Sequence, residues 1–289
     1  MTFLSILIAL LLERIFPQFI ELRRFDWLGD YSRWLVDVLH IERFGAWGSL
    51  ATLMFPLLLV VWMASGLFEN ALFGLFGLAF DVAIIFFTLG PRLLDRQVDD
   101  YLDAIDIGDE NLRRQKAGEL GGEISDSGLA GEAREFSRAI FVQANCGIFA
   151  LLFWFILLGP VAAVFYRILM QMSERDVLDN ALNHIQNKLR VLTGWMDWIP
   201  TRITLFCYMI SGNFDAALQA YRSGAANAVE IDEQNEALLE AVGAGAIGDD
   251  GNDAAMTPDT IVKKARGLYL RALVVWLLIL LLLGWMFAA

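Results

Sequence analysis

Residues 46–68 read AWGSLATLMFPLLLVVWMASGLF, a run of apolar and small residues without a charged side chain. A helix that crosses the hydrocarbon core of a bilayer needs about 20 predominantly apolar residues. The run is long enough to cross a membrane, and it decides the class of fold that the rest of the chain must fit. The run therefore indicates a membrane protein.

The composition of the whole chain agrees with this class. Of the 289 residues, 57% are hydrophobic and 19% are charged, and the mean hydropathy is +0.52. Soluble domains average roughly 45–50% apolar and about 25% charged residues, so a soluble enzyme is excluded. The two cysteines, Cys146 and Cys207, lie far apart in apolar stretches. Neither a disulfide framework nor a metal site is predicted from them.

The charge balance limits the partners of the protein. The net charge is −12, from 22 basic and 34 acidic residues. Binding to a nucleic acid needs a basic surface that displaces counterions, so nucleic acid is excluded as a partner. Most of the acidic excess lies in residues 91–138 and 213–267, which we predict to be aqueous. The partner that the composition does predict is the lipid bilayer.

Six stretches are apolar enough to be predicted as membrane spans of a single domain that covers residues 1–289. They are residues 2–17, 46–68, 72–90, 139–158, 195–212 and 268–289. The predicted fold class is an all-α, polytopic transmembrane bundle with two hydrophilic segments, residues 91–138 and 213–267.

The path of residues 159–194 relative to the membrane is left open. Gly159-Pro160 is expected to end the fourth span, because proline lacks a backbone donor and disfavours helix at the residue before it. The apolar residues 161–172 are too short to cross and read as a half-helix or an interfacial segment. Residues 180–192 have an amphipathic pattern, typical of a helix packed on the protein or lying in the membrane interface. Pro200 is expected to break the entry to the fifth span.

Basic residues predict the orientation in the membrane. The segments 17–45, 91–138 and 213–267 would lie on one side and carry 15 lysines and arginines, whereas the opposite side carries four. Since basic residues are concentrated in cytoplasmic loops, both large hydrophilic segments are predicted to be cytoplasmic in a multi-pass protein of the inner (plasma) membrane.

The two hydrophilic segments contain short helical patterns. They are expected at residues 109–120, 132–136 and 237–242, and the last is followed by a glycine-rich, acidic stretch, residues 243–253. Neither segment contains a phosphate-cradling loop with its following lysine, so no nucleotide site of that type is predicted.

Ionisable groups at membrane depth cost several kcal/mol unless they are paired or face water. Such groups are Glu13, Arg14, Asp81, Asp197 and Arg202. Three readings are open for them: a position at the headgroup level, neutralisation of an acid by Arg202, or a shared polar site between helices.

The strongest local signal is residues 194–202, GWMDWIPTR. Together with Glu13-Arg14, Tyr166-Arg167 and the stretch from Asn145 to Trp154, it resembles the AmpE family of inner-membrane proteins. The resemblance runs through nearly the whole chain in the same order.

The resemblance implies a sensory or regulatory membrane protein in β-lactamase induction, because AmpE is encoded beside a cytoplasmic amidase that trims recycled muropeptides. It implies as partner a cell-wall-recycling ligand or another protein, with no identified cofactor; a homo-oligomer is left open. We predict one polar intramembrane pocket for this unidentified ligand. Its candidate residues are Glu13, Arg14, Asn145, Tyr166, Arg167, Asp197 and Arg202.

AmpE proteins are similar to CbiB and CobD, cobalamin-pathway membrane proteins that join an aminopropanol unit to a corrinoid using ATP. In that branch the Asn145 region reads Asn-Thr-Ser-Asp-Gly, whereas here Asn145 is followed by Cys146-Gly147. The acids expected for metal-bound ATP are thus missing. No catalytic residue is predicted, and a related membrane ligase is kept as the alternative to a non-enzymatic regulator.

Overall fold

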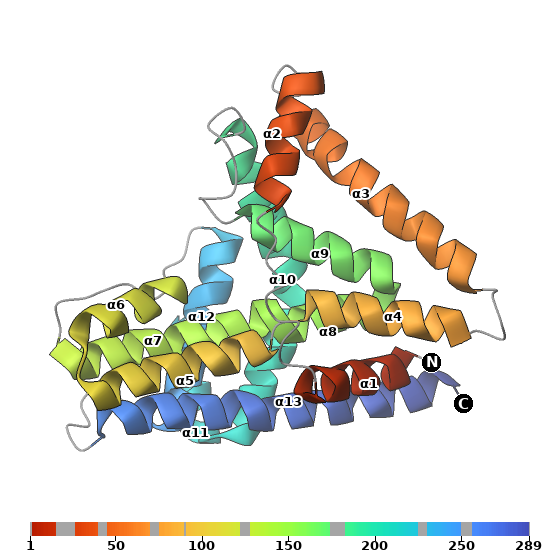
Figure 1. The fold of residues 1–289 in the computed structure, drawn as a ribbon. Helices are drawn as coiled ribbons and strands as arrows, with labels where there is room; N and C mark the ends of the chain where they lie inside the picture. The colour runs from red at the N-terminus through yellow and green to blue at the C-terminus, as the bar shows by residue number, and fades with distance from the viewer. Residues whose placement is uncertain are drawn as a thin grey trace. The chain divides into compact units, whose positions relative to one another are not determined.

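The computed structural model describes residues 2–15, 27–39, 45–69, 75–89, 91–121, 128–173, 183–224, 230–249 and 256–288. Throughout these ranges the regular structure is helical, without a strand, which confirms the predicted all-α class. The α-helices, labelled in Figure 1, are α1 (Thr2–Ile15), α2 (Trp27–Leu39), α3 (Ala46–Glu69), α4 (Leu75–Thr88), α5 (Pro91–Ile107), α6 (Glu110–Glu119), α7 (Gly128–Ala144), α8 (Ala150–Leu158), α9 (Pro160–Ser173), α10 (Asn183–Ser211), α11 (Phe214–Gly224), α12 (Ile231–Ile247) and α13 (Pro258–Ala288). The π-helical segment η4 (Asn145–Phe149) lies between α7 and α8.

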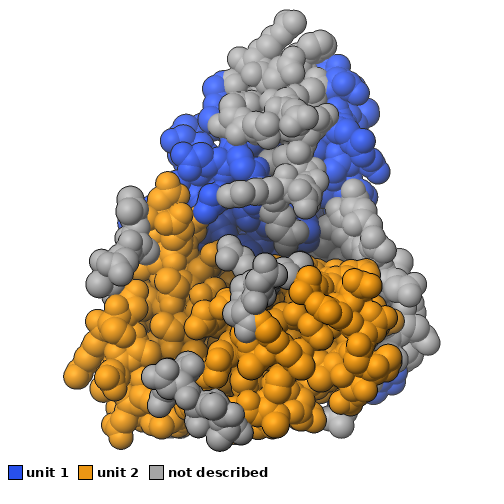
Figure 2. All heavy atoms as spheres, turned by 90° about the vertical axis from the view of Figure 1, so that its left-hand side faces the viewer, with its two compact units in different colours: residues 1–89, 151–196 blue, residues 90–150, 197–289 orange. Residues whose placement is uncertain are grey.

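The chain forms two compact units, which are coloured separately in Figure 2. Unit 1 comprises residues 1–89 and 151–196, and unit 2 comprises residues 90–150 and 197–289. The helix α10 begins in unit 1 and ends in unit 2.

Unit 1 contains apolar helices that pack in pairs. Contacts join α1 to α4, α3 to α4 and to α9, and α4 to α9. A cluster of buried side chains lies where α2, α3, α9 and the first half of α10 meet: Leu28, Leu35, Leu53, Met54, Leu169, Met172, Ile185 and Leu189 are among its members. The described part of the amphipathic segment predicted at 180–192 starts at Asn183 and is the first part of α10. This part packs on the protein, since Ile185 and Leu189 belong to the core.

Unit 2 is organised around α7. The helices α5, α12 and α13 each contact α7, and α5, α7 and α13 run side by side in Figure 1. The predicted hydrophilic segments thus fold into one helical body, because α5 and α6 come from residues 91–138 and α11 and α12 come from residues 213–267. Since α12 packs against α7, residues of the two segments lie side by side in this body.

Two helices are long and apolar enough to cross a membrane within the described residues, Ala46–Phe68 and Gly128–Leu158. The first matches the predicted span 46–68, and the second contains the predicted span 139–158 and extends it into the hydrophilic body. Phe3–Leu12 and Leu75–Thr88 are shorter apolar helices. The six-span topology stays a prediction.

The break predicted after the fourth span is confirmed. The helix α8 ends at Leu158, Gly159 has a φ of +82°, and α9 starts at Pro160. A positive φ is accessible to glycine at little cost, and proline is tolerated at the first position of a helix, where its missing N–H has no helical partner anyway. The segment predicted as a half-helix or an interfacial segment is the helix α9, Pro160–Ser173, and both predictions of its path relative to the membrane stay open.

The break predicted at Pro200 is wrong, because α10 continues through Pro200 from Asn183 to Ser211. Proline removes the donor for the carbonyl four residues earlier, which is that of Met196. That carbonyl accepts a hydrogen bond from Nε1 of Trp154 at 3.3 Å. A side chain outside the helix therefore replaces the missing bond.

The glycine-rich stretch after residue 242 begins as helix, since α12 extends to Ile247. The reason is close packing: a Cβ atom on Gly243 would lie 2.2 Å from Cδ2 of Phe141 on α7. Only glycine allows the two helices to approach this closely, so Gly243 serves the contact rather than a loop.

Candidate functional site

The junction of α7 and η4 carries the most buried amide of unit 2. The carboxamide of Asn145 donates from Nδ2 to Oγ1 of Thr201 at 3.2 Å and accepts from Oγ1 of Thr204 at 2.8 Å. All three side chains are fully buried. A π-helical segment often marks a functional position, and buried polar groups are stable only when they are hydrogen-bonded. Here the bonds fasten the α7–η4 junction to α10.

One turn before η4, aromatic residues continue this contact. The hydroxyl of Tyr208 on α10 donates to the carbonyl of Phe141 at 3.2 Å. The ring of Phe149 lies 6.2 Å from that of Tyr208 and 6.2 Å from that of Trp276 on α13. The junction is thus a packed, buried contact of α7, η4, α10 and α13, and it gives unit 2 a rigid centre.

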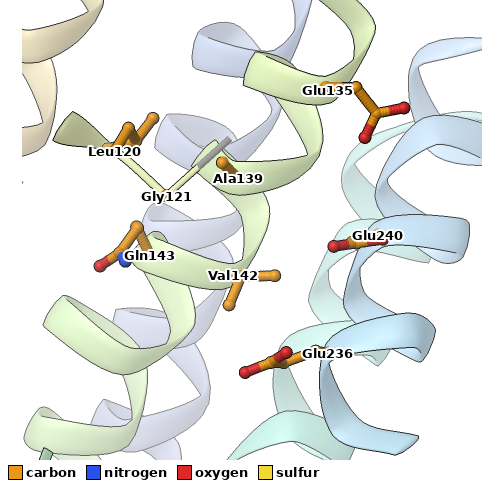
Figure 3. A pocket seen from close by; sticks show the side chains of 8 residues that line it. All are labelled: Leu120, Gly121, Glu135, Ala139, Val142, Gln143, Glu236 and Glu240. Carbon is orange, nitrogen blue, oxygen red and sulfur yellow. The ribbon is translucent and has the colours of Figure 1, made fainter. Parts of the chain in front are cut away.

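Next to this centre lies a polar cavity of about 500 Å³ between α7 and α12 (Figure 3). Its lining residues are Leu120, Gly121, Glu135, Ala139, Val142, Gln143, Glu236 and Glu240. Figure 3 shows Glu236 and Glu240 on α12 pointing toward α7, and Glu135 on α7 pointing toward α12. The cavity is therefore lined by carboxylates from two helices that belong to different hydrophilic segments.

The carboxylates are spread around the cavity. Glu135 accepts from Nη1 of Arg138 at 2.9 Å in a pair that is about a third exposed on each side. Nowhere in the described ranges do three or more His, Cys, Asp or Glu side chains form a group that could hold a metal ion. Separate carboxylates and the amide of Gln143 suit several hydrogen-bond donors of one organic ligand.

A buried ion pair holds the α6 side of the cavity. Arg113 on α6 donates to both carboxylate oxygens of Glu132 on α7, from Nε at 2.8 Å and from Nη2 at 3.1 Å. Tyr101 on α5 donates to Oε1 of the same carboxylate at 3.3 Å. Burial, and then the negative charge of Glu132, raise the pKa of Tyr101 well above its ordinary value. The neutral phenol is thus the form that the fold stabilises.

A second ion pair holds the α12 side. Arg134 donates from Nε to Oδ1 of Asp249, just beyond the end of α12, at 3.0 Å. Glu132 and Arg134, two residues apart on α7, therefore bond α6 and the end of α12, and the position of both walls depends on α7.

The candidate residues taken from the sequence fall in both units. Glu13 and Arg14 belong to the last turn of α1, where their side chains lie outside the described part of the structure. On α9, Tyr166 is buried and Arg167 is partly buried. These four residues belong to unit 1, whereas Asn145, Asp197 and Arg202 belong to unit 2. Their convergence on one pocket stays a prediction.

Asp197 is 6% exposed. Arg202 donates from Nη1 to the carboxamide of Asn235 on α12 and to the carbonyl of Trp198 at 3.1 Å. Within the described residues Arg202 forms no ion pair, and neutralisation of an acid by Arg202 stays a prediction. The guanidinium is turned toward α12, where it meets an amide instead.

Sequence reasoning missed several polar residues of unit 2. They are Thr201, Thr204, Glu135, Asn235, Glu236 and Glu240. Thr201 and Thr204 are three residues apart and therefore share a helix face, which was a usable signal. The glutamates had no such signal, because their cavity is created only when two distant hydrophilic segments pack together.

Comparison with known proteins places the chain in a family. A family model described as "Regulatory signalling modulator protein AmpE" matches residues 1–286. The "Cobalamin biosynthesis protein CobD" of Chromobacterium violaceum is 26% identical over 209 residues, which cover 69% of this chain and 62% of the relative. The protein of the same name in Stutzerimonas stutzeri is 27% identical over an aligned length of 320 residues, gaps included, which covers 99% of each chain. No solved structure matches the chain. Because the family model covers nearly every residue, the chain belongs to the AmpE family of regulatory signalling modulators, which are membrane proteins.

Proposed function

We propose that this AmpE-family protein is a non-enzymatic sensor of a cell-wall-recycling ligand in the inner membrane and that it modulates β-lactamase induction. The observation that carries the proposal is the cavity of about 500 Å³ between α7 and α12. Its glutamates belong to the two hydrophilic segments, and a ligand from the aqueous phase would reach it from that side. Its size falls within the usual range for small-molecule sites, about 300–1,000 Å³.

The lining of the cavity favours a ligand with several donors. Glu135, Glu236 and Glu240 line it with carboxylates, and the amide of Gln143 carries both an acceptor and a donor. Carboxylates bind ammonium groups through charge-assisted hydrogen bonds. The peptide part of a muropeptide has amide N–H groups and a free amine, and we propose that this part enters the cavity.

The helical connection offers a route from the cavity to the membrane. Gly128–Leu158 is one continuous helical stretch that lines the cavity near its start and is apolar toward its end. A ligand that draws α12 toward α7 would change the position of this helix. The membrane segment would then differ between the empty and the occupied protein. A sensor requires such a difference, because a ligand shifts a conformational equilibrium only when it binds one state more tightly than the other.

We propose that the hydrophilic body faces the cytoplasm, since the three segments predicted on its side carry 15 basic residues against four on the other. Ile107 at the end of α5 and Arg222 on α11 are exposed. Cysteines at these positions, in a background without Cys146 and Cys207, should resist a membrane-impermeant maleimide in intact cells. Labelling before lysis would reverse the orientation.

The alternative function is the membrane ligase that the resemblance to CbiB and CobD implies, and two relatives carry the name "Cobalamin biosynthesis protein CobD". The geometry of Asn145 does not favour it, because both ends of the carboxamide are engaged by Thr201 and Thr204. We therefore expect the purified protein not to hydrolyse Mg-ATP. Steady hydrolysis that is lost in Asp197→Asn would favour the ligase.

The cellular test is β-lactamase induction in a strain from which the gene is deleted. The proposal predicts an altered response to an inducing β-lactam and restoration by the wild-type chain. The double variant Glu236→Gln/Glu240→Gln should fail to restore the response at equal protein level. Glu233→Gln, an exposed change on the same helix outside the cavity lining, serves as the control. An unchanged response in the deletion strain would refute the role in induction.

A further inference from the structure

Arg202 is a cation that meets only neutral groups in the described part of the chain. Its Nη1 atom donates to Asn235 and to the carbonyl of Trp198, and its guanidinium lies 4.6 Å from the centre of the Trp198 ring. Asn235 is 3% exposed, so the acceptor that holds Nη1 is itself fixed. Arg202 is thus oriented without an acidic partner among the described residues.

The remaining donors of this side chain are available. Nε and Nη2 form no hydrogen bond with a described residue, since both bonds of Arg202 use Nη1. Arg202 is only partly buried. A guanidinium presents these two nitrogens as a planar fork that matches two oxygens of a phosphate or carboxylate. The open edge is therefore the edge that recognises an oxyanion.

The surface around Arg202 is apolar. Trp198, Ile199, Phe206 and Ile210 on the same side of α10 are between 44% and 53% exposed. In a membrane protein, an exposed apolar face of this kind contacts lipid, and tryptophan is enriched at the membrane interface. The contact with Asn235 sets Arg202 beside the hydrophilic helix α12, so the guanidinium lies at the boundary of the two surfaces.

We propose that Arg202 binds the phosphate of a phospholipid headgroup, with Asn235 and Trp198 as positioning residues. An uncompensated charge next to lipid is costly, and an anionic oxygen pair on the open fork removes that cost. The apolar stripe on α10 favours a lipid over a free anion, because it provides contact area for acyl chains. This site is separate from the cavity of the proposed sensor.

Lipid affinity of the purified full-length protein tests the proposal. The probes are phosphatidylglycerol, diacylglycerol with the same chains and inorganic phosphate, and binding is measured by native mass spectrometry. We expect phosphatidylglycerol to bind more tightly than diacylglycerol and Arg202→Gln to weaken it by about tenfold. Arg222→Gln, an exposed arginine on α11, should leave the affinity unchanged.

Two further variants keep the test decisive if Arg202→Gln does not accumulate. Arg202→Lys keeps the charge but loses the fork, and Asn235→Leu frees the guanidinium; each should weaken phosphatidylglycerol binding less than Arg202→Gln. Equal affinity in all variants would overturn the site. Two results would show that the site does not bind a lipid headgroup. One is binding of inorganic phosphate without displacement of phosphatidylglycerol, and the other is binding of diacylglycerol as tight as that of phosphatidylglycerol.

Discussion

The indole Nε1 of Trp154 donates a hydrogen bond to the backbone carbonyl of Met196 at 3.3 Å. This carbonyl is the one that Pro200 leaves without a helical donor, because a proline has no N–H to offer to the residue four positions earlier. The bond gives this carbonyl a donor from outside α10, in a helix that continues through the proline. It also ties α8 to α10 at a fixed register.

Loss of this bond should destabilise the protein measurably. Trp154→Phe keeps an aromatic ring but removes the donor, and we expect a loss of about 1–2 kcal/mol in the free energy of unfolding. In a Pro200→Ala background, the alanine N–H can bond the Met196 carbonyl, so the same change should cost less. Thermal unfolding of the detergent-solubilised variants measures both values. Equal losses in the two backgrounds would show that Trp154 acts through packing alone.

The Asn145 cluster gives a second stability prediction. Asn145→Leu leaves the hydroxyls of Thr201 and Thr204 buried without the amide, and we expect a loss of about 1–3 kcal/mol. The triple variant Asn145→Leu/Thr201→Val/Thr204→Val removes the polar groups together and should regain part of that loss. Chemical unfolding in detergent compares the two. A triple variant less stable than the single one would contradict the predicted compensation.

Two ion pairs of α6 differ in burial, and we expect them to contribute differently to the stability of the fold. Glu132→Gln strands Arg113, whose side chain is 12% exposed, and should cost about 2–3 kcal/mol. Glu110→Gln breaks a pair with Arg114 that is 43% and 60% exposed, and should cost less than about 1 kcal/mol. Limited proteolysis of the region between α6 and α7 should be faster only in the Glu132 variant. Similar protection in both variants would argue against a clamp at Glu132.

The buried phenol of Tyr101 should make the folded state less stable at alkaline pH. Its pKa is raised in the fold by burial and by Glu132, so the folded state holds the phenolic proton more tightly than the unfolded chain does. The resulting stability is present below the unfolded pKa of about 10 and is lost as the pH rises above it. Melting temperatures of the wild type should therefore fall more steeply above about pH 10 than those of Tyr101→Phe. Parallel pH profiles would exclude this linkage.

Much of the architecture follows from local sequence. The helix end at Gly159-Pro160 and the apolar run 46–68 were predictable because glycine, proline and unbroken hydrophobicity act within a few residues. The continuity of α10 was not, since the donor that rescues Pro200 lies 42 residues before Met196. Local rules describe what proline removes from a helix, but not what a distant indole restores.

The candidate site was predictable only in part. Arg202 was chosen because a charge in an apolar stretch needs a reason, and the structure gives it an amide partner, Asn235, that the sequence did not indicate. The carboxylates of the cavity, such as Glu135 and Glu236, are ordinary acidic residues of hydrophilic segments. They become a site only through the packing of α12 on α7, which single-sequence periodicity does not encode.

The central claim is that the cavity between α7 and α12 binds a cell-wall-recycling ligand. Its most direct test is the melting temperature of the purified full-length protein with increasing amounts of muropeptides prepared from digested cell wall. A ligand that binds the folded state raises stability in proportion to the logarithm of its concentration once it exceeds its dissociation constant. The account predicts this rise in the wild type and in Glu233→Gln, and its loss in Glu236→Gln/Glu240→Gln. No rise in the wild type, or the same rise in all three proteins, would contradict it.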